Sequence, residues 1–205
     1  MSETNRFDES AATWDEQPHP VKLARGVADE IARQIHLSRN IDVLDFGCGT
    51  GLLTLALQPL VRRVSGADTS AGMLEVLRQK VQDQGLTNVE TILLDPGVPL
   101  SSSEHFHLIV SSMALHHVAN LPPLFKRFHE QLHPGGRVAL ADLDREDGSF
   151  HEDPRDVYHP GFERSEFQTL LAEAGFADLG ATTAIITSKG GHHYPVFLIT
   201  GHKAD

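Results

Sequence analysis

The 205-residue sequence lacks several features that would place it in particular classes of protein. Cys48 is the single cysteine, so no intramolecular disulfide can form within the chain. No run of about 18 apolar residues is present, which argues against a membrane span. The opening residues, Met1 to Ser10, are polar and acidic and contain no apolar core of a secretory signal. We therefore expect a cytoplasmic protein.

Positive charge is also scarce. Seventeen lysine and arginine residues face twenty-eight aspartate and glutamate residues, which gives a formal net charge of −11. Nucleic acids and anionic membrane surfaces are themselves negative, so neither is expected as the main partner. The length fits a single domain, 1–205, with a substantial core. Nothing in the sequence indicates the oligomeric state.

Glycine is concentrated directly after a short apolar run. Residues 41–46 predict a strand buried on both faces, and Gly47, Gly49 and Gly51 follow it at alternate positions. Glycine permits positive φ and lets a ligand approach the backbone closely. Residues 52–58 predict a helix, whose first backbone N–H groups would be free to bind that ligand. We call residues 47–51 the glycine turn and predict a nucleotide-sized ligand there.

The spacing of the glycines bears on which nucleotide binds. The dinucleotide fingerprint G-x-G-x-x-G needs a glycine where this chain has Leu52, so a nicotinamide-dependent oxidoreductase is disfavoured. A second apolar run, 61–67, ends in Asp68, about 20 residues further on, where a carboxylate can accept hydrogen bonds from ribose hydroxyl groups. The pattern therefore indicates a ligand that carries a ribose.

Predicted strands and helices alternate along the chain. The predicted strands are 41–46, 61–68, 89–95, 106–111, 138–141, 177–187 and 195–201. The predicted helices are 20–37, 52–58, one from about 70 to just before Gly85, one that starts after Asn120 and ends before Pro134, and 165–175. Asn120 is the predicted N-cap of the fourth helix, and a capping box is predicted at 165–168. Five rounds of alternation imply a mainly parallel sheet with helices on both faces, and the final pair of strands predicts one antiparallel strand near the C-terminus.

Three segments, taken in order, resemble the successive signatures of the S-adenosylmethionine-dependent methyltransferases with a Rossmann-like fold. They are residues 43–51 (VLDFGCGTG), 66–74 (GADTSAGML) and 132–136 (LHPGG). The resemblance covers roughly residues 20–205. It implies an α/β three-layer sandwich with a seven-stranded sheet, S-adenosylmethionine as cofactor and S-adenosylhomocysteine as product. Residues 1–38 form an N-terminal arm and helix containing Phe7 and Trp14, which either pack against the surface of the domain or act as a lid over the ligand, and the resemblance favours the lid.

The resemblance further implies roles for individual residues. The methionine part of the cofactor would be held by Asp45, Gly47, Cys48, Gly49 and Gly51, and both ribose hydroxyls would be held by Asp68. The adenine would be held by Thr69, Met73, Leu94 and Asp95. The residue nearest the methyl group would be Ser111. Cys48 is interpreted as a small residue in a crowded loop, since nothing near it in sequence would activate a thiolate. The cofactor should lie across the carboxyl ends of the first, second and fourth strands.

Histidine is frequent, with thirteen in the chain. His116, His117 and His151 are candidate catalytic residues, because a neutral imidazole can take a proton from a hydroxyl or thiol acceptor. No histidine spacing predicts a metal site. The pair Asp142 and Asp144 remains an alternative, since such carboxylates can hold a hard cation.

Two sequence motifs that are missing after the fourth predicted strand narrow the range of possible methyl acceptors. Enzymes that methylate nucleobase amines carry an Asn- or Asp-Pro-Pro-aromatic tetrapeptide after the fourth strand, where this chain has Ser111-Ser-Met-Ala114. Paired glutamates, expected for methylation of protein arginine, do not occur there either. We expect a small-molecule substrate with oxygen as the favoured reactive atom and with nitrogen and sulfur open. The alternative is a non-catalytic, cofactor-binding or activating partner subunit.

Overall fold

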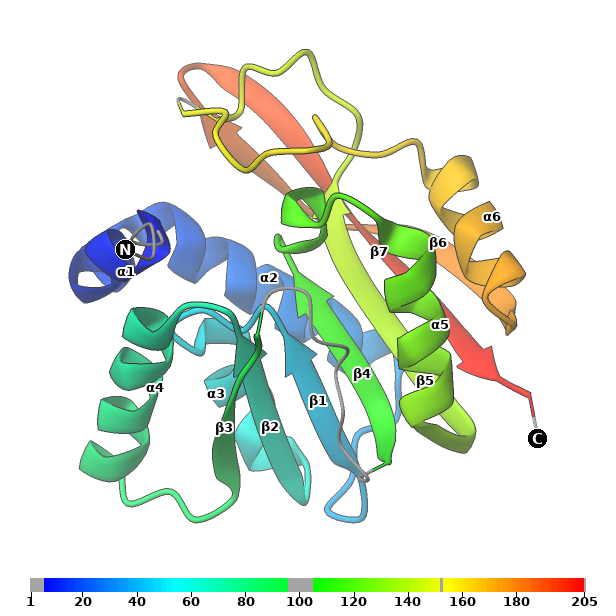
Figure 1. Ribbon diagram of the computed structural model, residues 1–205, viewed down its shortest axis with the longest axis horizontal. Helices are drawn as coiled ribbons and strands as arrows, with labels where there is room; N and C mark the ends of the chain where they lie inside the picture. Colours follow the sequence, from blue (N-terminus) through cyan, green and yellow to red (C-terminus); the bar gives the residue numbers. More distant parts are fainter. Residues whose placement is uncertain (1–5, 96–104, 152, 205) are drawn as a thin grey trace. The chain divides into compact units, whose positions relative to one another are not determined.

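The computed structural model describes residues 6–95, 105–151 and 153–204 (Figure 1). The chain divides into two compact units, residues 1–101 and 102–205, and each is described by itself. No helix of the described ranges is long and apolar enough to cross a membrane. The expected single domain and the expected lid remain predictions.

The first unit contains three parallel strands in the order β3-β2-β1 (Figure 1). Its elements are α1 (Arg6–Ser10), η1 (Ala11–Glu16), α2 (Pro18–Gln34), β1 (Asp42–Phe46), α3 (Leu52–Leu57), η2 (Gln58–Leu60), β2 (Arg63–Asp68), α4 (Ala71–Asp83) and β3 (Val89–Leu93). Asp45 lies opposite Gly66 in the register of β1 and β2, and Asp68 lies opposite Leu93 in that of β2 and β3. The carboxyl ends of these strands therefore meet beside the glycine turn.

Helix α4 shows how the sequence directs packing in this unit. Ser70 occupies the N-cap position, and its hydroxyl accepts a hydrogen bond from the backbone N–H of Met73. Met73, Leu74 and Leu77 are buried at helical spacing, and Leu74 and Leu77 pack with Cys48 of the glycine turn. The core of the first unit thus lies directly under the predicted ligand site.

The second unit contains four strands in the order β4-β5-β7-β6. Its elements are β4 (Phe106–Ser112), η3 (Leu115–His117), α5 (Leu121–Gln131), β5 (Leu132–Leu143), α6 (Arg164–Glu173), β6 (Phe176–Lys189) and β7 (His192–Lys203). Strands β4 and β5 are parallel, and β7 runs antiparallel to both of its neighbours. The predicted seven-stranded, mainly parallel sheet with one antiparallel strand near the C-terminus is confirmed.

An aromatic core stabilises the second unit. The ring of Phe167 on α6 lies 5.1 Å from that of Phe125 on α5 and 5.3 Å from that of Phe197 on β7, measured between centroids. Phe162 belongs to the segment between β5 and α6, and its ring lies 5.1 Å from Phe167. All four side chains are buried, and burying such a ring contributes on the order of 2 kcal/mol. Phe162 thereby anchors the long 144–163 segment to the core.

Several local predictions were wrong. Helix α6 begins at Arg164 with Glu163 at the N-cap position, so Ser165 lies inside the first turn and the predicted capping box is not formed. Asn120 does occupy the N-cap of α5, but its side chain makes no capping bond to the described residues. The last two strands were predicted too short. They are joined by a two-residue turn at Gly190 and Gly191, whose φ values of 59° and 82° suit a tight hairpin.

Element boundaries also shifted. Strand β5 starts at Leu132 rather than at residue 138, because Phe106 pairs with Leu132 before the register shifts and Leu108 pairs with Arg137. The predicted helix 20–37 is Pro18–Gln34. No regular structure was predicted before residue 20, yet residues 6–16 form the short helices α1 and η1.

Candidate functional site

The glycine turn is fixed against strand β2. The backbone N–H groups of Gly47 and Cys48 both donate to the carbonyl oxygen of Ala67, at 2.8 and 3.1 Å. Gly47, Gly49 and Gly51 all have positive φ, at 69°, 53° and 83°. The chain therefore needs glycine at these positions simply to follow the turn.

Two of these glycines have different spatial surroundings. A Cβ on Gly49 would have Met73 Sδ at 4.0 Å as its nearest neighbour, so the backbone there is open. A Cβ on Gly51 would lie 2.3 Å from Cδ1 of the buried Leu77. Gly49 thus leaves room beside the turn, whereas Gly51 allows α3 and α4 to pack closely.

Asp68 is the carboxylate at the end of β2. Its Oδ2 accepts from the backbone N–H of Gly49 at 2.7 Å, and its Oδ1 accepts from that of Ser70 at 2.9 Å. Burial raises the pKa of Asp68, and these backbone hydrogen bonds oppose the rise only in part. The carboxylate is half-buried and therefore accessible to a ligand that lies on the turn.

The other residues predicted to hold the adenine gather near Asp68. The backbone N–H of Leu94 donates to the carbonyl oxygen of Asp68 at 2.8 Å. Thr69 and Asp95 are exposed, while Met73 is buried and lies near Gly49. The structure brings these residues to one edge of the first unit. Their contacts with an adenine remain predictions.

Asp45 is buried at the end of β1, where its Oδ2 accepts a hydrogen bond from the Thr54 hydroxyl at 2.5 Å. Burial raises the pKa of Asp45 from 3.8 to about 7, with a smaller contribution from the charge of Asp68, and the Thr54 bond acts in the opposite direction. Burial likewise raises the pKa of the Cys48 thiol. The thiol therefore stays protonated near neutral pH, in line with its interpretation as a packing residue.

The raised pKa of Asp45 predicts a specific dependence of stability on pH. The folded state holds the Asp45 proton more tightly than the unfolded state, so this contribution is full below pH 3.8 and is lost as the pH rises through about 7. The difference between 3.8 and about 7 corresponds to on the order of 4 kcal/mol. We expect the unfolding free energy of the ligand-free wild type, minus that of Asp45→Asn, to fall from pH 4 to pH 8 in urea titrations. A difference independent of pH would contradict this.

The N-terminal arm is attached to the first unit by two carboxylates. Asp8 Oδ1 accepts from the Ser70 hydroxyl at 2.6 Å and from the backbone N–H of Gly72 at 2.8 Å. Asp15 accepts from the Thr50 hydroxyl at 2.6 Å and forms an ion pair with Lys80. Sequence reasoning singled out Phe7 and Trp14 in this arm and missed both carboxylates.

Ser111 and the candidate catalytic histidines belong to the second unit. Ser111 is buried near the carboxyl end of β4, and His116 and His117 follow in η3. The His116 ring lies 4.1 Å from that of His117 and 4.7 Å from that of His151, measured between centroids. The structure therefore brings together the three histidines that were named separately from the sequence.

Asp142, at the carboxyl end of β5, connects to this histidine cluster. Its Oδ1 lies 2.7 Å from His116 Nδ1, and both side chains are buried. Asp144 instead forms hydrogen bonds at 2.6 and 2.7 Å with the Arg164 guanidinium. The two carboxylates thus have separate partners. No group of three or more histidine, cysteine or acidic residues in the described ranges is placed to hold a metal ion.

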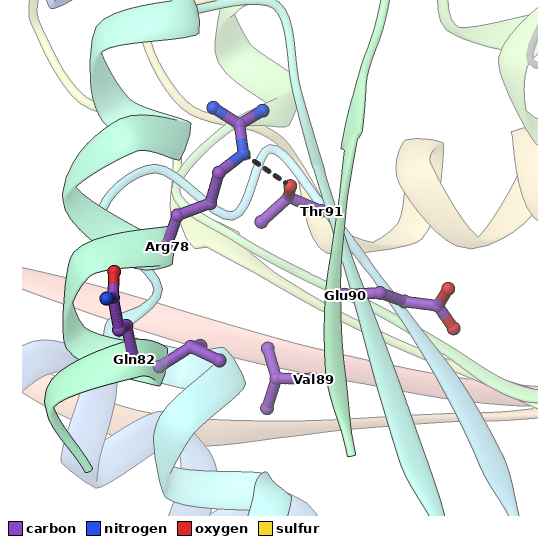
Figure 2. Close-up of a pocket in the computed structure, with 6 residues that line it drawn as sticks. Arg78, Gln82, Val89, Glu90 and Thr91 are labelled. Carbon is purple, nitrogen blue, oxygen red and sulfur yellow. Dashed lines mark hydrogen bonds between the residues drawn. The ribbon is translucent and has the colours of Figure 1, made fainter. Parts of the chain in front are cut away.

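A small hollow of 190 Å³ lies between α4 and β3 (Figure 2). Arg78 and Gln82 line it from the helix, and Val89, Glu90 and Thr91 line it from the strand, with Arg78 Nε donating to Thr91 Oγ1 at 2.9 Å. This volume is below the range of about 300–1,000 Å³ that is usual for ligand sites. It lies along the first half of β3, away from the carboxyl ends of the strands, and we assign it no ligand.

The residues at the glycine turn fit an adenosyl cofactor. Gly49 leaves open space beside the backbone, and Asp68 places a carboxylate at the same point. A sequence model described as a methyltransferase domain matches residues 21–180. The chain belongs to the methyltransferase family. S-adenosylmethionine is the cofactor of this family.

Individual relatives agree with this assignment. The ubiquinone biosynthesis O-methyltransferase of Ruegeria pomeroyi is 28% identical over 171 residues, which cover 73% of this chain and 66% of the relative. The complex of the Haloferax volcanii Trm112 methyltransferase activator with a methyltransferase contains a chain of the same fold, with a TM-score of 0.79 and 16% identity over 100% of both chains. Phosphoethanolamine N-methyltransferase 2 of Haemonchus contortus, crystallised with S-adenosyl-L-methionine, gives a TM-score of 0.71 and 14% identity over 97% of this chain and 60% of that one.

The match with the curated relatives is partial. It spans 54%, 66% and 52% of the length of three of them. At 14% and 16% identity, the two solved structures show the fold alone. Family membership follows from the sequence model.

Proposed function

We propose that the methyltransferase transfers a methyl group from S-adenosylmethionine to a small-molecule acceptor, with oxygen as the reacting atom. The observation that carries this proposal is the Asp68 carboxylate beside the open backbone of Gly49. A carboxylate in this position accepts hydrogen bonds from the ribose hydroxyls of a nucleoside. The cofactor supplies an activated methyl group and its own leaving group.

The protein has mainly to bind and orient the two reactants. Correct orientation alone can lower a barrier by roughly 7–11 kcal/mol. In the proposed site Asp68 holds the ribose, the glycine turn with Asp45 and Cys48 holds the methionine part, and Thr69, Met73, Leu94 and Asp95 surround the adenine. Ser111 would lie nearest the methyl group. These assignments follow the family resemblance, and the positions of the unit-one residues at a single sheet edge support them.

Two observations support a small acceptor and oxygen. The segment Ser111-Ser-Met-Ala114 lacks the tetrapeptide of nucleobase amine methylation. The chain is also 28% identical over 171 residues to an enzyme named for O-methylation in ubiquinone biosynthesis. His116, His117 and His151 are the proposed groups that receive the acceptor proton, because a neutral imidazole can act as a general base.

Binding of the cofactor can be tested by thermal shift. A ligand present at about 100 times its dissociation constant adds roughly 2.7 kcal/mol to stability, which for a chain of this size is a rise of several degrees in Tm. We expect this rise with S-adenosylhomocysteine and no rise with NADH. A rise with NADH alone would instead support the oxidoreductase alternative.

Turnover separates an enzyme from a non-catalytic partner subunit. The purified chain should transfer label from methyl-labelled S-adenosylmethionine to small-molecule hydroxyl compounds, with product detected by mass spectrometry. Binding of S-adenosylhomocysteine without transfer to any oxygen, nitrogen or sulfur acceptor of a broad panel would favour the partner subunit.

A further inference from the structure

His116 and Asp142 form a buried pair in the second unit. The His116 ring is 1% exposed and the Asp142 side chain is fully buried. Besides His116 Nδ1, Asp142 accepts hydrogen bonds from three backbone N–H groups. Leu143 N donates to Oδ1 at 2.8 Å, and Leu115 N and His116 N donate to Oδ2 at 3.1 and 3.2 Å. An acceptor with four donors is best satisfied as an ionised carboxylate.

This arrangement fixes the tautomer of His116. An ionised carboxylate only accepts hydrogen bonds, so Nδ1 must carry the hydrogen of the 2.7 Å contact. Burial alone would raise the pKa of Asp142, but its interactions with His116 and with the backbone N–H groups outweigh burial, so the pKa lies below its ordinary value. In the neutral imidazole, the lone pair is then on Nε2.

Nε2 of His116 is buried and has no hydrogen-bond partner within the described residues. Buried polar atoms in native proteins are nearly always paired, so such an atom indicates a group, water or ligand that binds there. Rings surround it. Those of His117 and His151 lie 4.1 and 4.7 Å from the His116 ring, and Phe150 lies 4.9 Å from His151, all measured between centroids.

The turn that carries His116 is itself held firmly. The backbone N–H of Tyr158 donates to the carbonyl oxygen of His116 at 2.9 Å, and His117 Nδ1 lies 2.7 Å from the carbonyl oxygen of Asp156. Both contacts come from the segment between β5 and α6, which Phe162 anchors in the core. A base must be held in a fixed orientation to act efficiently, and these contacts supply it.

We propose that His116 Nε2 removes the proton from a phenol-type hydroxyl group of the acceptor, and that Asp142 positions the imidazole for this step. The inference rests on the proposed function and names its acceptor class. As the acceptor oxygen forms a bond to the methyl carbon, the carbon–sulfur bond of the cofactor breaks and its electron pair stays on sulfur. The hydroxyl proton passes to Nε2, and the resulting imidazolium is stabilised by the Asp142 carboxylate.

The acidity of the acceptor follows from the strength of this base. A phenol has a pKa of about 10, within a few units of that of an imidazole, whereas a hydroxyl group as weakly acidic as water has a far higher pKa and does not transfer its proton readily. The rings of His117 and His151 next to His116 also suit a planar acceptor, since offset and edge-to-face ring contacts are favourable. A phenol meets both conditions.

Nuclear magnetic resonance of the histidine side chains tests the His116–Asp142 pair, here called the dyad, without cofactor or turnover. The His116 signals in ¹⁵N spectra are assigned by their loss in His116→Gln. In the wild type with a neutral His116 ring, we expect Nδ1 of His116 to be protonated and Nε2 to be unprotonated. In Asp142→Asn, the side-chain NH₂ can take the place of either carboxylate oxygen. At the Oδ2 position it would face the backbone N–H groups of Leu115 and His116, whereas at the Oδ1 position it would face only one backbone N–H, that of Leu143. At the Oδ1 position the NH₂ donates to His116 Nδ1, so His116 should switch to the tautomer protonated on Nε2. Asp144→Asn is the matched control and should leave it unchanged. A wild-type Nε2–H tautomer would overturn the proposal.

A series of phenols of increasing acidity tests the step itself. His116→Gln and Asp142→Asn should lower kcat by about 10²–10⁴ for phenols that are neutral at the assay pH. For phenols already ionised at that pH the loss should be less than about tenfold, because no proton has to be removed. Equal losses across the series would show a structural role and overturn the base assignment.

The failure of the dyad is distinguishable from that of the proposed function. If the wild type binds S-adenosylhomocysteine but methylates no phenol, the acceptor class assigned here is wrong while the cofactor site stands. If the wild type does not bind S-adenosylhomocysteine, the proposed function is wrong, and the tautomer of His116 still decides whether the dyad exists.

Discussion

Replacing Asp68 by alanine should abolish the rise in Tm that S-adenosylhomocysteine produces. In the proposed site, Asp68 accepts hydrogen bonds from both ribose hydroxyls, and a hydrogen bond to a charged group contributes about 1.5–3 kcal/mol. Losing both would weaken binding by roughly 10²–10⁴-fold. The measurement is the Tm of wild type and variant across a titration of the ligand, together with the dissociation constant from calorimetry.

The Tm of Asp68→Ala without ligand is one control, because Asp68 also accepts hydrogen bonds from the backbone N–H groups of Gly49 and Ser70. Loss of these bonds should lower the Tm of the ligand-free variant. Only the additional rise in Tm that the ligand produces reports ribose binding. Asp83→Ala is the matched variant, since it removes an exposed carboxylate from α4, bonded there to Gln79, without touching the glycine turn. Asp83→Ala should keep the full increment. Retention of that increment by Asp68→Ala would remove the ribose assignment.

Gly51→Ala should be strongly destabilising. The residue has φ of 83°, and strain of this kind costs about 1–3 kcal/mol for a side chain with a Cβ. The new Cβ would also lie 2.3 Å from Cδ1 of Leu77, which is fully buried. Overpacking adds about 1–3 kcal/mol. We expect a total loss of about 2–6 kcal/mol in urea unfolding, out of the roughly 5–15 kcal/mol typical of a domain.

Gly85→Ala separates the backbone strain at a positive φ from the clash with Leu77. Gly85 has φ of 61°, yet a Cβ there would meet nothing within 4 Å, so only the backbone term of about 1–2 kcal/mol applies. A double-mutant cycle adds a second comparison. Because Leu77→Ala removes the clashing atoms, Gly51→Ala should cost less in that background than in wild type. Equal losses for the two glycine variants, or simple additivity in the cycle, would contradict the proposed clash.

Local patterns predicted the parts of this protein that depend on neighbours in sequence. Apolar runs predicted the strands that carry Asp45 and Asp68, because a strand buried on both faces is rich in apolar residues. The spacing of the three glycines predicted a turn with positive φ, which the backbone shows. Boundaries were less accurate. Strand β5 begins at Leu132 because of pairing with Phe106, and no pattern within β5 itself reports that partner.

Long-range contacts were beyond the reach of these patterns. Asp8 lies 64 residues from Gly72 in sequence, and Asp15 lies 35 residues from Thr50, yet both pairs are hydrogen-bonded. The sequence predicted Asp142 as a possible cation ligand and His116 as a candidate base, but not the two residues as partners. The adjacency of β4 and β5 was the signal that could have joined them, since parallel neighbours bring their carboxyl ends to the same edge.

The sequence by itself determined the family, the cofactor and the order of strands and helices, because these depend on short motifs and on the periodicity of apolar residues. The tertiary structure alone decided which carboxylate meets which histidine and which acidic residues attach the N-terminal arm. The physical reason is that a hydrogen bond or ion pair depends on distances of about 3 Å between atoms. Such distances between residues far apart in the chain are set by the packing of the core and by the register of the strands.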